Sequence, residues 1–512
     1  MTAPNMPTAI SVGDHPLTLS EYRLVSEGHA AARLAPEAVA RMERFRASLM
    51  RQLESGVRIY GVNTGYGADS VTPLAPGDIR SMQRNTIVSH AVGTGRIASP
   101  EVTRGMLLLK ANVLAQGFSA TRPVVAERLL DLLNAGVLPI VPEQGSLAAS
   151  GDLVPSGHLA AALIGEGEVI YKGNRTSARE ALTAAGLDPI EPEEKEGLAL
   201  VNGTAFTEAL ALAATLRAER LLRAADIAAA ATLQAMKGFL AAFEPRAVEP
   251  RPFAGAVLVA ANVTRLCRGG TLLGQPPSRV HDPYCIRCVP QVHGASRDAF
   301  RYVKEQVLVE LNAFTDNPLV LDDGTYVSAG NFHAQPVGLP LDTLTVLIAE
   351  LASISQRRTQ HMVAPVYDIG LPPKLTREPK KGMGLFMLNT TASALVSENK
   401  TLSFPASVDS MAVDTTEDHV SMASVAGRKA LEVIGNTAHV LAIELICACQ
   451  ALDLHAPLEA SPNISAVHAM VRETVPFVAG DRPLYREISA LAARLLAGDL
   501  DAFLEDQQIS LD

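Results

Sequence analysis

Three small residues, Ala149-Ser150-Gly151, lie before Asp152 and an apolar helical pattern in the segment GSLAASGDLVPSGHLAAALIGEG, residues 145–167. A turn followed by a helix N-cap is the simplest interpretation of this segment. A chemical interpretation is also open. In a tight, strained turn the nitrogen of Gly151 can attack the carbonyl carbon of Ala149. Loss of water from the ring and from the Ser150 side chain would leave a conjugated methylene, a carbon electrophile that no ordinary side chain supplies.

The residues around this tripeptide favour such chemistry. A helix N-terminus behind the electrophile would stabilise the negative charge that develops when it accepts a nucleophile. Asp152 could order the backbone for ring closure. A serine hydrolase with Ser150 as nucleophile and His158 as base is disfavoured, because the sequence lacks a Gly-X-Ser-X-Gly turn and the predicted fold lacks a parallel sheet.

Other polar, glycine-rich clusters interrupt the apolar pattern, and each is weak evidence alone. Tyr60 precedes a glycine-rich turn, where a tyrosine is more often a packed residue with a satisfied hydroxyl group. His90, Arg287 and Glu417 have the ordinary interpretations of a structural histidine, an ion-pair partner and a helix cap. The clusters are IYGVNTGYGADS (59–70), VSHAVGTG (88–95), LVNGTA (200–205), HDPYCIRC (281–288), SAGNFHAQP (328–336) and DTTEDHVSMA (414–423).

Long helices must position these clusters. Apolar residues at i, i+3 and i+4 predict helices over residues 36–55, 99–117, 125–136, 203–243, 296–314, 339–363, 426–452 and 484–498. Several are Ala-rich and apolar on more than one face, as expected of a helix surrounded by other helices. Strand-like segments are few, namely 57–62, 167–174 and 319–331, and residues 244–284 read as loop-rich.

The predicted fold is therefore mainly α. We expect a large central bundle of long helices and a smaller, mixed N-terminal part that carries the Ala149–Gly151 loop. The predicted domains are residues 1–200 and residues 201–512.

Composition narrows the class of protein. Of 512 residues, 48% are hydrophobic, which is enough for a large core and argues against disorder. The net charge of −10 argues against nucleic acid as a partner. The N-terminus has no basic start followed by an apolar stretch, and no run of about 18 uncharged apolar residues appears. We therefore expect a cytoplasmic protein that does not enter a membrane.

The five cysteines are expected to be reduced. A zinc site built from Cys285, Cys288 and either His281 or His293 is a minor alternative. A second ligand pair at suitable spacing is missing from the sequence, so we predict no metal.

The segment AASGDLVPSGHLA resembles the cofactor-forming segment of the aromatic amino acid ammonia-lyases. That family makes 4-methylidene-imidazol-5-one (MIO) autocatalytically from Ala-Ser-Gly. Further segments match the family in chain order between about residues 15 and 480: YGVNTGYG, SHAVGTG, LVNGT, DPYCIRCVPQ, ELNAFTDNP, GNFHAQP, SENK and EDHVSM. The resemblance implies a carbon–nitrogen lyase with an amino acid substrate and an ammonia-lyase/fumarase-like fold. It also implies a homotetramer whose active sites are each shared by three subunits.

The resemblance assigns roles by position. Ala149, Ser150 and Gly151 would form MIO, and Tyr60 would be the base that removes the β-proton. Asp152 and Asn202 would support the cofactor, and Arg287 would bind the substrate carboxylate. Tyr284, Asn202 and Phe332 would line the site.

Ser89-His90 is the selectivity pair of the family, and Ser-His there is typical of its histidine-specific branch. Glu417 also matches that branch. An imidazole ring offers a donor and an acceptor, so His90 and Glu417 suit it as partners. The implied reaction is elimination of ammonia from L-histidine to give urocanate, a step of amino acid catabolism.

Several residues near the expected site depart from the histidine branch. His281 stands in place of Gln, Thr415-Thr416 in place of Asn-Gln, and Gln335 in place of Glu. The segment GYGADS is closer to phenylalanine lyases. A tyrosine or phenylalanine lyase that makes coumarate or cinnamate therefore stays open, as does a 2,3-aminomutase with the same cofactor. A helical pseudoenzyme without the cofactor is the non-enzymatic alternative.

Overall fold

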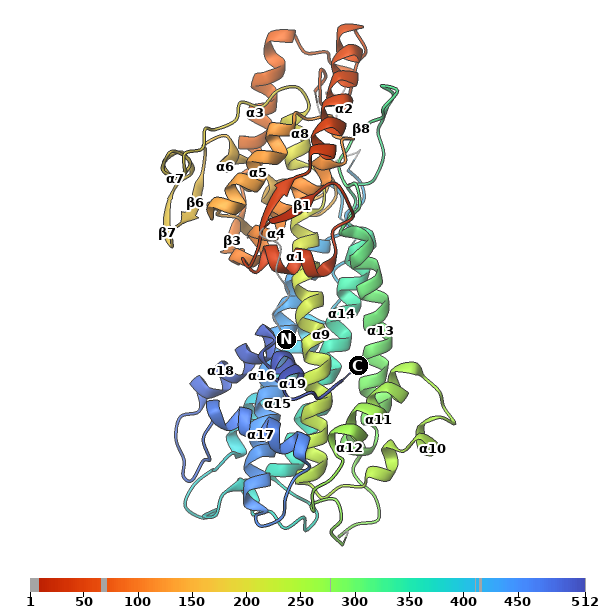
Figure 1. Cartoon of the computed structure of the whole chain (residues 1–512), viewed down its shortest axis with the longest axis vertical. Coiled ribbons are helices and arrows are strands. Elements are labelled where there is room, and N and C mark those ends of the chain that lie inside the picture. The colour runs from red at the N-terminus through yellow and green to blue at the C-terminus, as the bar shows by residue number, and fades with distance from the viewer. Residues whose placement is uncertain (1–8, 66–70, 277, 410, 414–416, 512) are drawn as a thin grey trace. The chain divides into compact units, whose positions relative to one another are not determined.

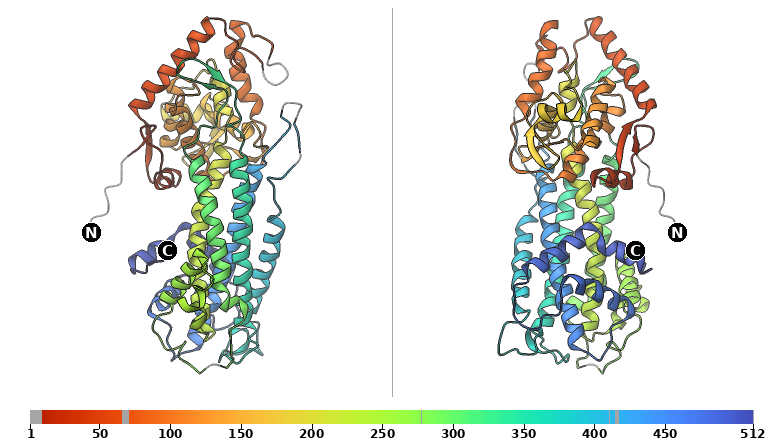
Figure 2. Two further views of the ribbon diagram at one scale, coloured as in Figure 1. Left: turned by 90° about the vertical axis from the view of Figure 1, so that its right-hand side faces the viewer. Right: turned by 60° about the vertical axis from the view of Figure 1, so that its left-hand side comes forward.

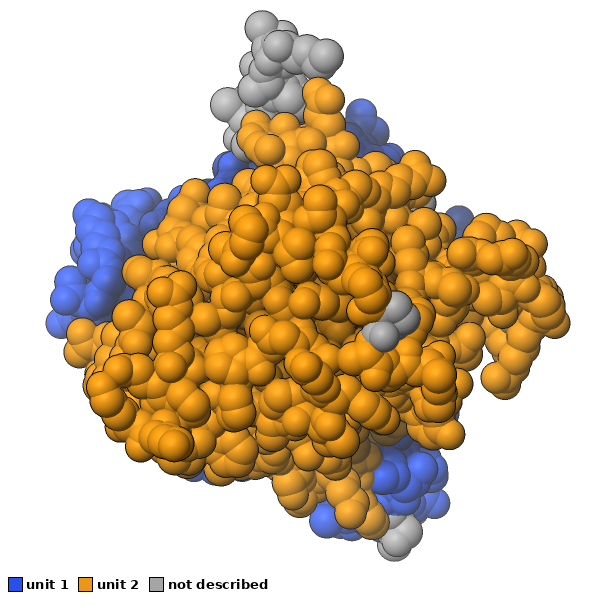
Figure 3. Space-filling view, turned by 90° about the horizontal axis from the view of Figure 1, so that it is seen from below, with its two compact units in different colours: residues 1–213, 305–341, 405–428 blue, residues 214–304, 342–404, 429–512 orange. Residues whose placement is uncertain are grey.

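A computed structural model describes residues 9–65, 71–276, 278–409, 411–413 and 417–511, and within them helices predominate (Figure 1). The predicted mainly α fold is confirmed. The chain forms two compact units, each discontinuous in sequence and coloured separately in Figure 3. Unit 1 comprises residues 1–213, 305–341 and 405–428, and unit 2 comprises residues 214–304, 342–404 and 429–512. The division at residue 200 stays a prediction.

Four long helices contribute residues to both units: α9 (Ala205–Ala235), α13 (Val289–Glu310), α14 (Gln335–Val363) and α16 (Ala423–Leu454). Their unit 2 segments run alongside one another (Figure 2). The predicted helix over residues 203–243 ends earlier than expected, at Ala235. Lys237 then adopts a left-handed conformation with φ of 48°, which breaks the helix before a short 3-10 turn, η3 (Leu240–Phe243).

Short strands and shorter helices make up the rest of unit 1. The strands form small sheets, β1-β2, β3-β5, β4-β6-β7 and β8-β9, of which only β1-β2 is parallel. The strand-like segments predicted at 167–174 and 319–331 lie in the hairpins β6-β7 and β8-β9. The elements are β1 (Ala9–Val12), α1 (Leu19–Ser26), β2 (Ala31–Leu34), α2 (Pro36–Glu54), η2 (Pro76–Asp78), α3 (Ile79–His90), β3 (Thr94–Ile97), α4 (Pro100–Ala115), α5 (Pro123–Ala135), β4 (Leu138–Pro139), β5 (Pro142–Gln144), α6 (Leu153–Leu163), β6 (Glu168–Tyr171), β7 (Asn174–Ser177), α7 (Ala178–Ala185), α8 (Glu196–Val201), β8 (Leu319–Val320) and β9 (Tyr326–Val327).

The strand predicted over residues 57–62 is wrong, because this segment is a turn. The Ile59 amide donates to Oδ1 of Asn63 at 2.7 Å, and the Val62 amide donates to the Ile59 carbonyl at 3.1 Å. Ile59 and Val62 are both fully buried in a cluster with Phe45 and Leu49. Burial of these two turn residues produces the apolar spacing that resembled a strand.

Unit 2 corrects the loop-rich interpretation of residues 244–284. α11 occupies Ala254–Leu266 and buries an apolar face that includes Val259 and Val263. Flanking Pro, Arg and Gly residues obscured this Ala- and Val-rich segment in the sequence. The remaining elements of unit 2 are α10 (Pro245–Val248), α12 (Tyr284–Arg287), η4 (Pro373–Leu375), α15 (Phe386–Leu402), α17 (Pro462–Thr474), α18 (Tyr485–Ala497) and α19 (Asp499–Asp506).

α14 and α16 are long and apolar enough to cross a membrane by length and composition alone. In the most apolar window of each, however, 67% and 72% of the residues are buried within the protein. Core helices of water-soluble proteins pass the same test. The expectation that the chain does not enter a membrane stays a prediction.

A buried ion pair joins two of the long helices within unit 2. Arg358 of α14 donates from Nη2 to Oε2 of Glu444 on α16 at 2.8 Å, and both side chains are fully buried. Thr232 of α9 also donates to Glu444, at 2.7 Å. His293 of α13 contacts Nη1 of Arg358 through Nε2 at 3.3 Å. The core of this bundle is thus held by a polar network as well as by apolar packing.

We predict that Glu444→Gln lowers the free energy of unfolding by about 3–5 kcal/mol, because it leaves the Arg358 guanidinium buried without a counter-charge. The urea midpoint, followed by far-ultraviolet circular dichroism, measures the loss. Asp188→Asn, at an exposed loop position, is the control and should change stability by less than about 0.5 kcal/mol. Equal midpoints for the two variants would contradict the prediction.

Candidate active site

A cavity of about 270 Å³ in unit 1 is lined by six of the thirteen predicted site residues. Its walls come from α3, α6 and α8, from the turn at Tyr60, from the segments around β8 and β9, and from the segments before α14 and α16. The predicted residues that line it are Tyr60, His90, Ser150, Asn202, Phe332 and Glu417. The structure therefore brings together residues that are up to 357 positions apart in sequence, by the difference between Tyr60 and Glu417.

The backbone of Gly151 lies against the backbone of Gly203 beside this cavity. The two residues form an isolated β-bridge, and the Asp152 amide donates to the Gly203 carbonyl at 2.7 Å. A Cβ atom on Gly151 would lie 2.2 Å from that carbonyl oxygen. Both glycines also have positive φ, 73° and 92°. Only glycine fits at either position, so the backbone on both sides of this contact is closely constrained.

Asp152 fixes the Ala149–Gly151 loop through its buried carboxylate. It is fully buried, and Oδ1 accepts hydrogen bonds from Ser146 Oγ at 2.8 Å and from Thr207 Oγ1 at 2.9 Å. Oδ2 accepts from the Thr207 amide at 2.7 Å. Burial raises the pKa of the Asp152 carboxyl group, while these hydrogen bonds act in the opposite direction. The side chain joins the loop to the first turn of α9.

The segment after Glu417 holds the other side of the loop. Ser421 Oγ donates to the Ala148 carbonyl at 2.8 Å, and Ala148 has a positive φ of 50°. Ala148, Ala334 and Ala423 form a fully buried cluster of small side chains. These methyl groups allow three chain segments to pack closely, so the loop conformation depends on residues far away in sequence.

Ser150 and Glu417 are hydrogen-bonded within the cavity. Ser150 Oγ donates to Oε1 of Glu417 at 2.9 Å. His158, the base in the serine hydrolase alternative, instead accepts from the Gly93 amide through Nε2 at 2.9 Å. The structure therefore gives no support to a Ser150–His158 pair.

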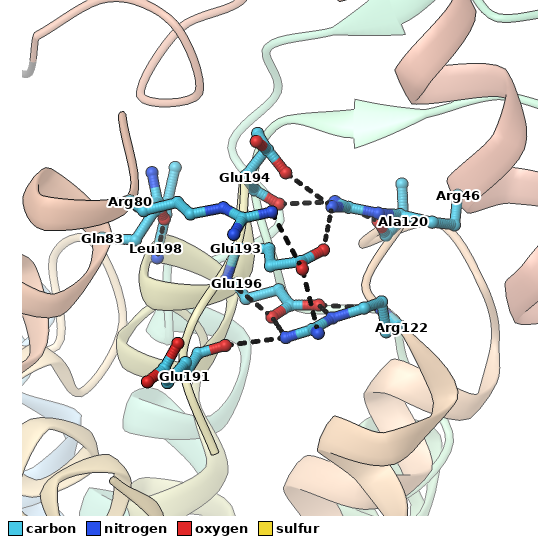
Figure 4. A network of polar contacts seen from close by, with 10 residues as sticks. All are labelled: Arg46, Arg80, Gln83, Ala120, Arg122, Glu191, Glu193, Glu194, Glu196 and Leu198. Atoms are coloured by element: carbon cyan, nitrogen blue, oxygen red, sulfur yellow. Dashed lines mark hydrogen bonds and ion pairs between the residues drawn. The ribbon is translucent and has the colours of Figure 1, made fainter. Parts of the chain in front are cut away.

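Tyr60 lies in the turn at residues 60–63 and lines the cavity. The buried Gln83 of α3 fixes this turn, since its Nε2 donates to the Gly61 carbonyl at 3.1 Å. Oε1 of the same side chain accepts from the Leu198 amide of α8 at 3.1 Å (Figure 4). One amide thus links the backbone next to Tyr60 to the helix that leads to Asn202.

His90 is the last residue of α3, and its Nδ1 lies 2.6 Å from the Thr86 carbonyl oxygen. A carbonyl only accepts, so Nδ1 carries a proton in this contact, and in the tautomer protonated at Nδ1 alone Nε2 is an acceptor. Gly157 of α6 lets the helices meet here, because a Cβ atom would lie 2.7 Å from the His90 backbone. Ser89 is exposed, donates to the Thr86 carbonyl at 3.2 Å, and is not among the described residues that line the cavity.

Three predicted residues belong to unit 2 and do not line the cavity of unit 1: His281, Tyr284 and Arg287. His281 is exposed, and Tyr284 is 71% exposed. The Arg287 guanidinium lies 4.8 Å from the centre of the Tyr284 ring, and Nε is buried with no hydrogen-bond partner in the described part of the chain.

Asn317 is a cavity residue to which sequence reasoning gave no role. Its carbonyl accepts from Asn202 Nδ2 at 3.1 Å, and its Oδ1 accepts from the Ala329 amide at 2.7 Å. It lies in ELNAFTDNP, a segment quoted for the family resemblance, and that was the available signal. The other lining residues that were missed are Thr86, Leu153, Leu198, Val201, Ser328 and Ala329.

A network of arginines and glutamates holds the start of α8 (Figure 4). Arg122 binds the fully buried Glu196 through Nε at 2.9 Å and through Nη2 at 2.7 Å. Arg46 binds Glu194 at 2.7 Å. The buried Lys195 pairs with Asp316 at 2.6 Å. These contacts fix α8, which supplies Leu198, Val201 and, at its end, Asn202 to the cavity.

Lys110 of α4 holds the end of α8. It is 1% exposed, and its ammonium group donates to the Asn202 carbonyl and, at 3.3 Å, to the Ala199 carbonyl. Burial lowers the pKa of Lys110 to about 8, although the carboxylates of Asp316 and Asp152 oppose the shift. Lys110 stands within a predicted helix, where a lysine is ordinarily on the exposed face. The sequence alone therefore gave no signal for its burial.

The described residues contain no group of three or more His, Cys, Asp or Glu side chains that could hold a metal ion. Burial raises the pKa of the Cys285 thiol to about 11, which disfavours the thiolate that zinc requires. His293 is already bound through Nδ1 to Asp226 at 2.9 Å. These contacts weaken the zinc alternative.

Thr415-Thr416 and residues 66–70, which the sequence singled out as departures, lie outside the described residues.

The chain is similar to known proteins over almost its whole length. The family model described as aromatic amino acid lyase matches residues 17–473. A histidine ammonia-lyase of Geobacillus thermodenitrificans is 45% identical over 497 residues, 97% of each chain. A structure of histidine ammonia-lyase from Trypanosoma cruzi has a TM-score of 0.90 at 36% identity and covers 97% of this chain and 95% of its own. A tyrosine aminomutase from Streptomyces globisporus has a TM-score of 0.93 at 31% identity, with 98% of this chain and 100% of its own covered.

The chain therefore belongs to the aromatic amino acid lyase family. The predicted family, fold and class of carbon–nitrogen lyase are confirmed. An amino acid substrate fits this family, whose members are of the MIO-dependent type.

Lys110 gives a prediction for the pH dependence of stability. The folded chain favours the neutral amine, so below pH 8 folding carries the full cost of a buried ammonium group. Between pH 8 and the ordinary pKa of 10.5 the unfolded chain holds more protons, and the free energy of unfolding contributed by Lys110 rises with pH. The slope is at most about 1.4 kcal/mol per pH unit.

Urea unfolding of the wild type and Lys110→Met at pH values from 7.5 to about 10 measures this contribution as a difference between the two chains. The free energy of unfolding of the wild type minus that of Lys110→Met should rise with pH, whichever chain is the more stable at pH 7.5. Lys380→Met, at an exposed position, is the control. A signed difference that stays constant or falls as pH rises would contradict the prediction.

Proposed function

We propose that this chain eliminates ammonia from L-histidine to give urocanate. The observation that carries the proposal is that His90 and Glu417 line the same cavity as Ser150. The histidine ammonia-lyases at 45% and 44% identity support the same substrate.

The residues present fit the formation of MIO from Ala149-Ser150-Gly151. The support is the close approach of Gly151 to Gly203, which leaves no room for any side chain, and the buried anchor of the loop at Asp152. MIO would supply an electrophilic carbon that makes the substrate amine a good leaving group. Asn202, held by Asn317 and Lys110, is placed to support it.

Substrate selection follows from the hydrogen-bonding groups of the cavity. Formation of MIO consumes the Ser150 hydroxyl and so removes a donor from Oε1 of Glu417, which an imidazole N–H can replace. Neutral His90 offers Nε2 as a second acceptor. A substrate imidazole in its protonated form has two N–H donors, whereas a neutral imidazole or a phenol has one donor and a phenyl ring has none. The cavity therefore favours histidine, because phenylalanine would offer neither acceptor a donor.

A 2,3-aminomutase is the second candidate, and the high structural similarity to a tyrosine aminomutase favours it. Such an enzyme returns the amine to the β-carbon, so a β-amino acid among the products would identify it. Tyrosine or phenylalanine lyase activity, giving coumarate or cinnamate, would require that the departures at His281 and Thr415-Thr416 have changed the selectivity.

The working form is proposed to be a homotetramer with shared active sites. The exposed Tyr284 ring and the unsatisfied Nε of Arg287 support this, because another copy of the chain could cover them. In the assembly Arg287 would bind the substrate carboxylate with two parallel hydrogen bonds. The proposed location is the cytoplasm, with neither nucleic acid nor membrane as a partner.

We predict that L-histidine gives the dominant signal when the purified protein is incubated separately with L-histidine, L-tyrosine and L-phenylalanine. The measurement is ultraviolet absorbance of the conjugated acrylate, with chromatography to detect β-amino acids. Ser150→Ala, which cannot form the methylene group, is the matched control and should be inactive but folded. Turnover of tyrosine or phenylalanine without histidine would overturn the substrate, and activity of Ser150→Ala would overturn the cofactor.

Tyr60→Phe should lower kcat for the preferred substrate by about 10²–10⁴-fold, because it removes the proposed base and keeps the ring that packs in the turn. Initial rates over a range of substrate concentrations separate kcat from KM. An unchanged kcat would exclude Tyr60 as the base.

A further inference from the structure

We propose that Lys110 is a positioning residue for MIO formation, which it supports by holding the Asn202–Gly203 peptide against the Ala149–Gly151 loop. The inference rests on the proposed function and extends it to a residue outside the cavity. Lys110 is not among the described residues that line the site, and it acts through the backbone alone.

The burial of Lys110 calls for an explanation. An ammonium group at 1% exposure is costly, and within the described ranges the structure gives Nζ only two acceptors, the carbonyls of Ala199 and Asn202. Other buried lysine and arginine side chains of this chain bind carboxylates directly, as Lys195 binds Asp316 and Arg358 binds Glu444. Lys110 instead donates hydrogen bonds to two backbone carbonyl oxygens beside the site.

A short path leads from Lys110 to the reacting atoms. The carbonyl that it binds belongs to Asn202, and the same peptide supplies the nitrogen of Gly203. The Gly203 amide is itself fixed, because it donates to Oδ1 of Asn202 at 2.8 Å. The Gly203 carbonyl then receives the Asp152 amide, and the Gly203 backbone lies against Gly151. A shift of the Asn202 carbonyl therefore moves the surface on which Gly151 rests.

The ring closure that depends on this surface is demanding. The Gly151 nitrogen forms a bond to the Ala149 carbonyl carbon. One water leaves with the Ala149 oxygen and the amide protons of Gly151 and Ser150, and the other leaves with the Ser150 hydroxyl group and Cα hydrogen. No oxidant or reductant is needed. The two reacting backbone atoms must be held in contact, since misplacement by about 1 Å costs about a hundredfold in rate.

The two ends of α8 are held separately, so the effect of Lys110 can be isolated. The start of the helix is fixed by Glu196 with Arg122, by Lys195 with Asp316 and by the rest of the network in Figure 4. Lys110 holds only the end. Removal of its charge should release the Asn202–Gly203 peptide and leave the anchored start of α8 in place.

The test is the intact mass of purified Lys110→Met, an uncharged variant of similar length. The wild-type chain should weigh two water molecules less than its sequence. Lys110→Met should close about a hundredfold more slowly and keep both waters after the same expression time. Leu129→Ala is the matched control: it removes a buried side chain of α5 in the same unit, so it should lower the melting temperature and still close fully.

The outcomes separate the two proposals. A wild-type chain with its full mass would refute the proposed cofactor, whatever the variant does. A closed wild type together with a folded, fully closed Lys110→Met would overturn the role of Lys110. Lys110→Gln, which keeps one donor without charge, should close at an intermediate rate if Lys110→Met does not fold. If neither variant folds, Lys110 is a stability residue and the inference is wrong.

Discussion

The contact between the Gly151 and Gly203 backbones is the constraint on which the candidate site depends. It requires positive φ at both residues, and it excludes any side chain at Gly151 by a separation of 2.2 Å. Such a contact forms only if both segments are held rigidly from outside. Asp152 holds one segment through Ser146 and Thr207. Strained backbone of this kind persists where the surrounding structure fixes it more than once, as several independent anchors do here.

The anchors of the site are buried charged side chains, each held by a few direct hydrogen bonds or by one ion pair. Asp152 accepts from two hydroxyl groups and an amide, and Lys195 pairs with Asp316. Desolvation makes each of these groups costly, so each position tolerates little change. The same desolvation cost keeps these side chains in one position, because a buried charged group that loses its partner has no other favourable arrangement in the apolar interior.

The sequence predicted the family, the mainly α fold class and part of the cavity lining, but not every element that positions them. Short stretches of sequence were enough to recognise the Ala149–Gly151 segment and the helical periodicity, and the order of the motifs identified the family. Tyr60 was found by motif, yet its segment was taken as a strand because Val57, Ile59 and Val62 give it a β-branched composition, although they pack in and beside a turn. α11 was hidden by its Pro- and Gly-rich flanks. Asn317 and the Gly151–Gly203 contact depend on pairings between distant segments, which no local pattern encodes.

The discontinuity of unit 1 has a consequence for the timing of events on the ribosome. The loop at residues 146–148 is bound by Ser421 and Ser424, which are synthesised more than 270 residues later. At about 5–20 residues per second this interval lasts tens of seconds. During that time the Ala-Ser-Gly segment lacks these two contacts, although its partners Ser146, Gly203 and Thr207 have already been synthesised. If MIO forms as proposed, we expect ring closure to wait for the last contacts, so that the electrophile arises only inside the folded chain.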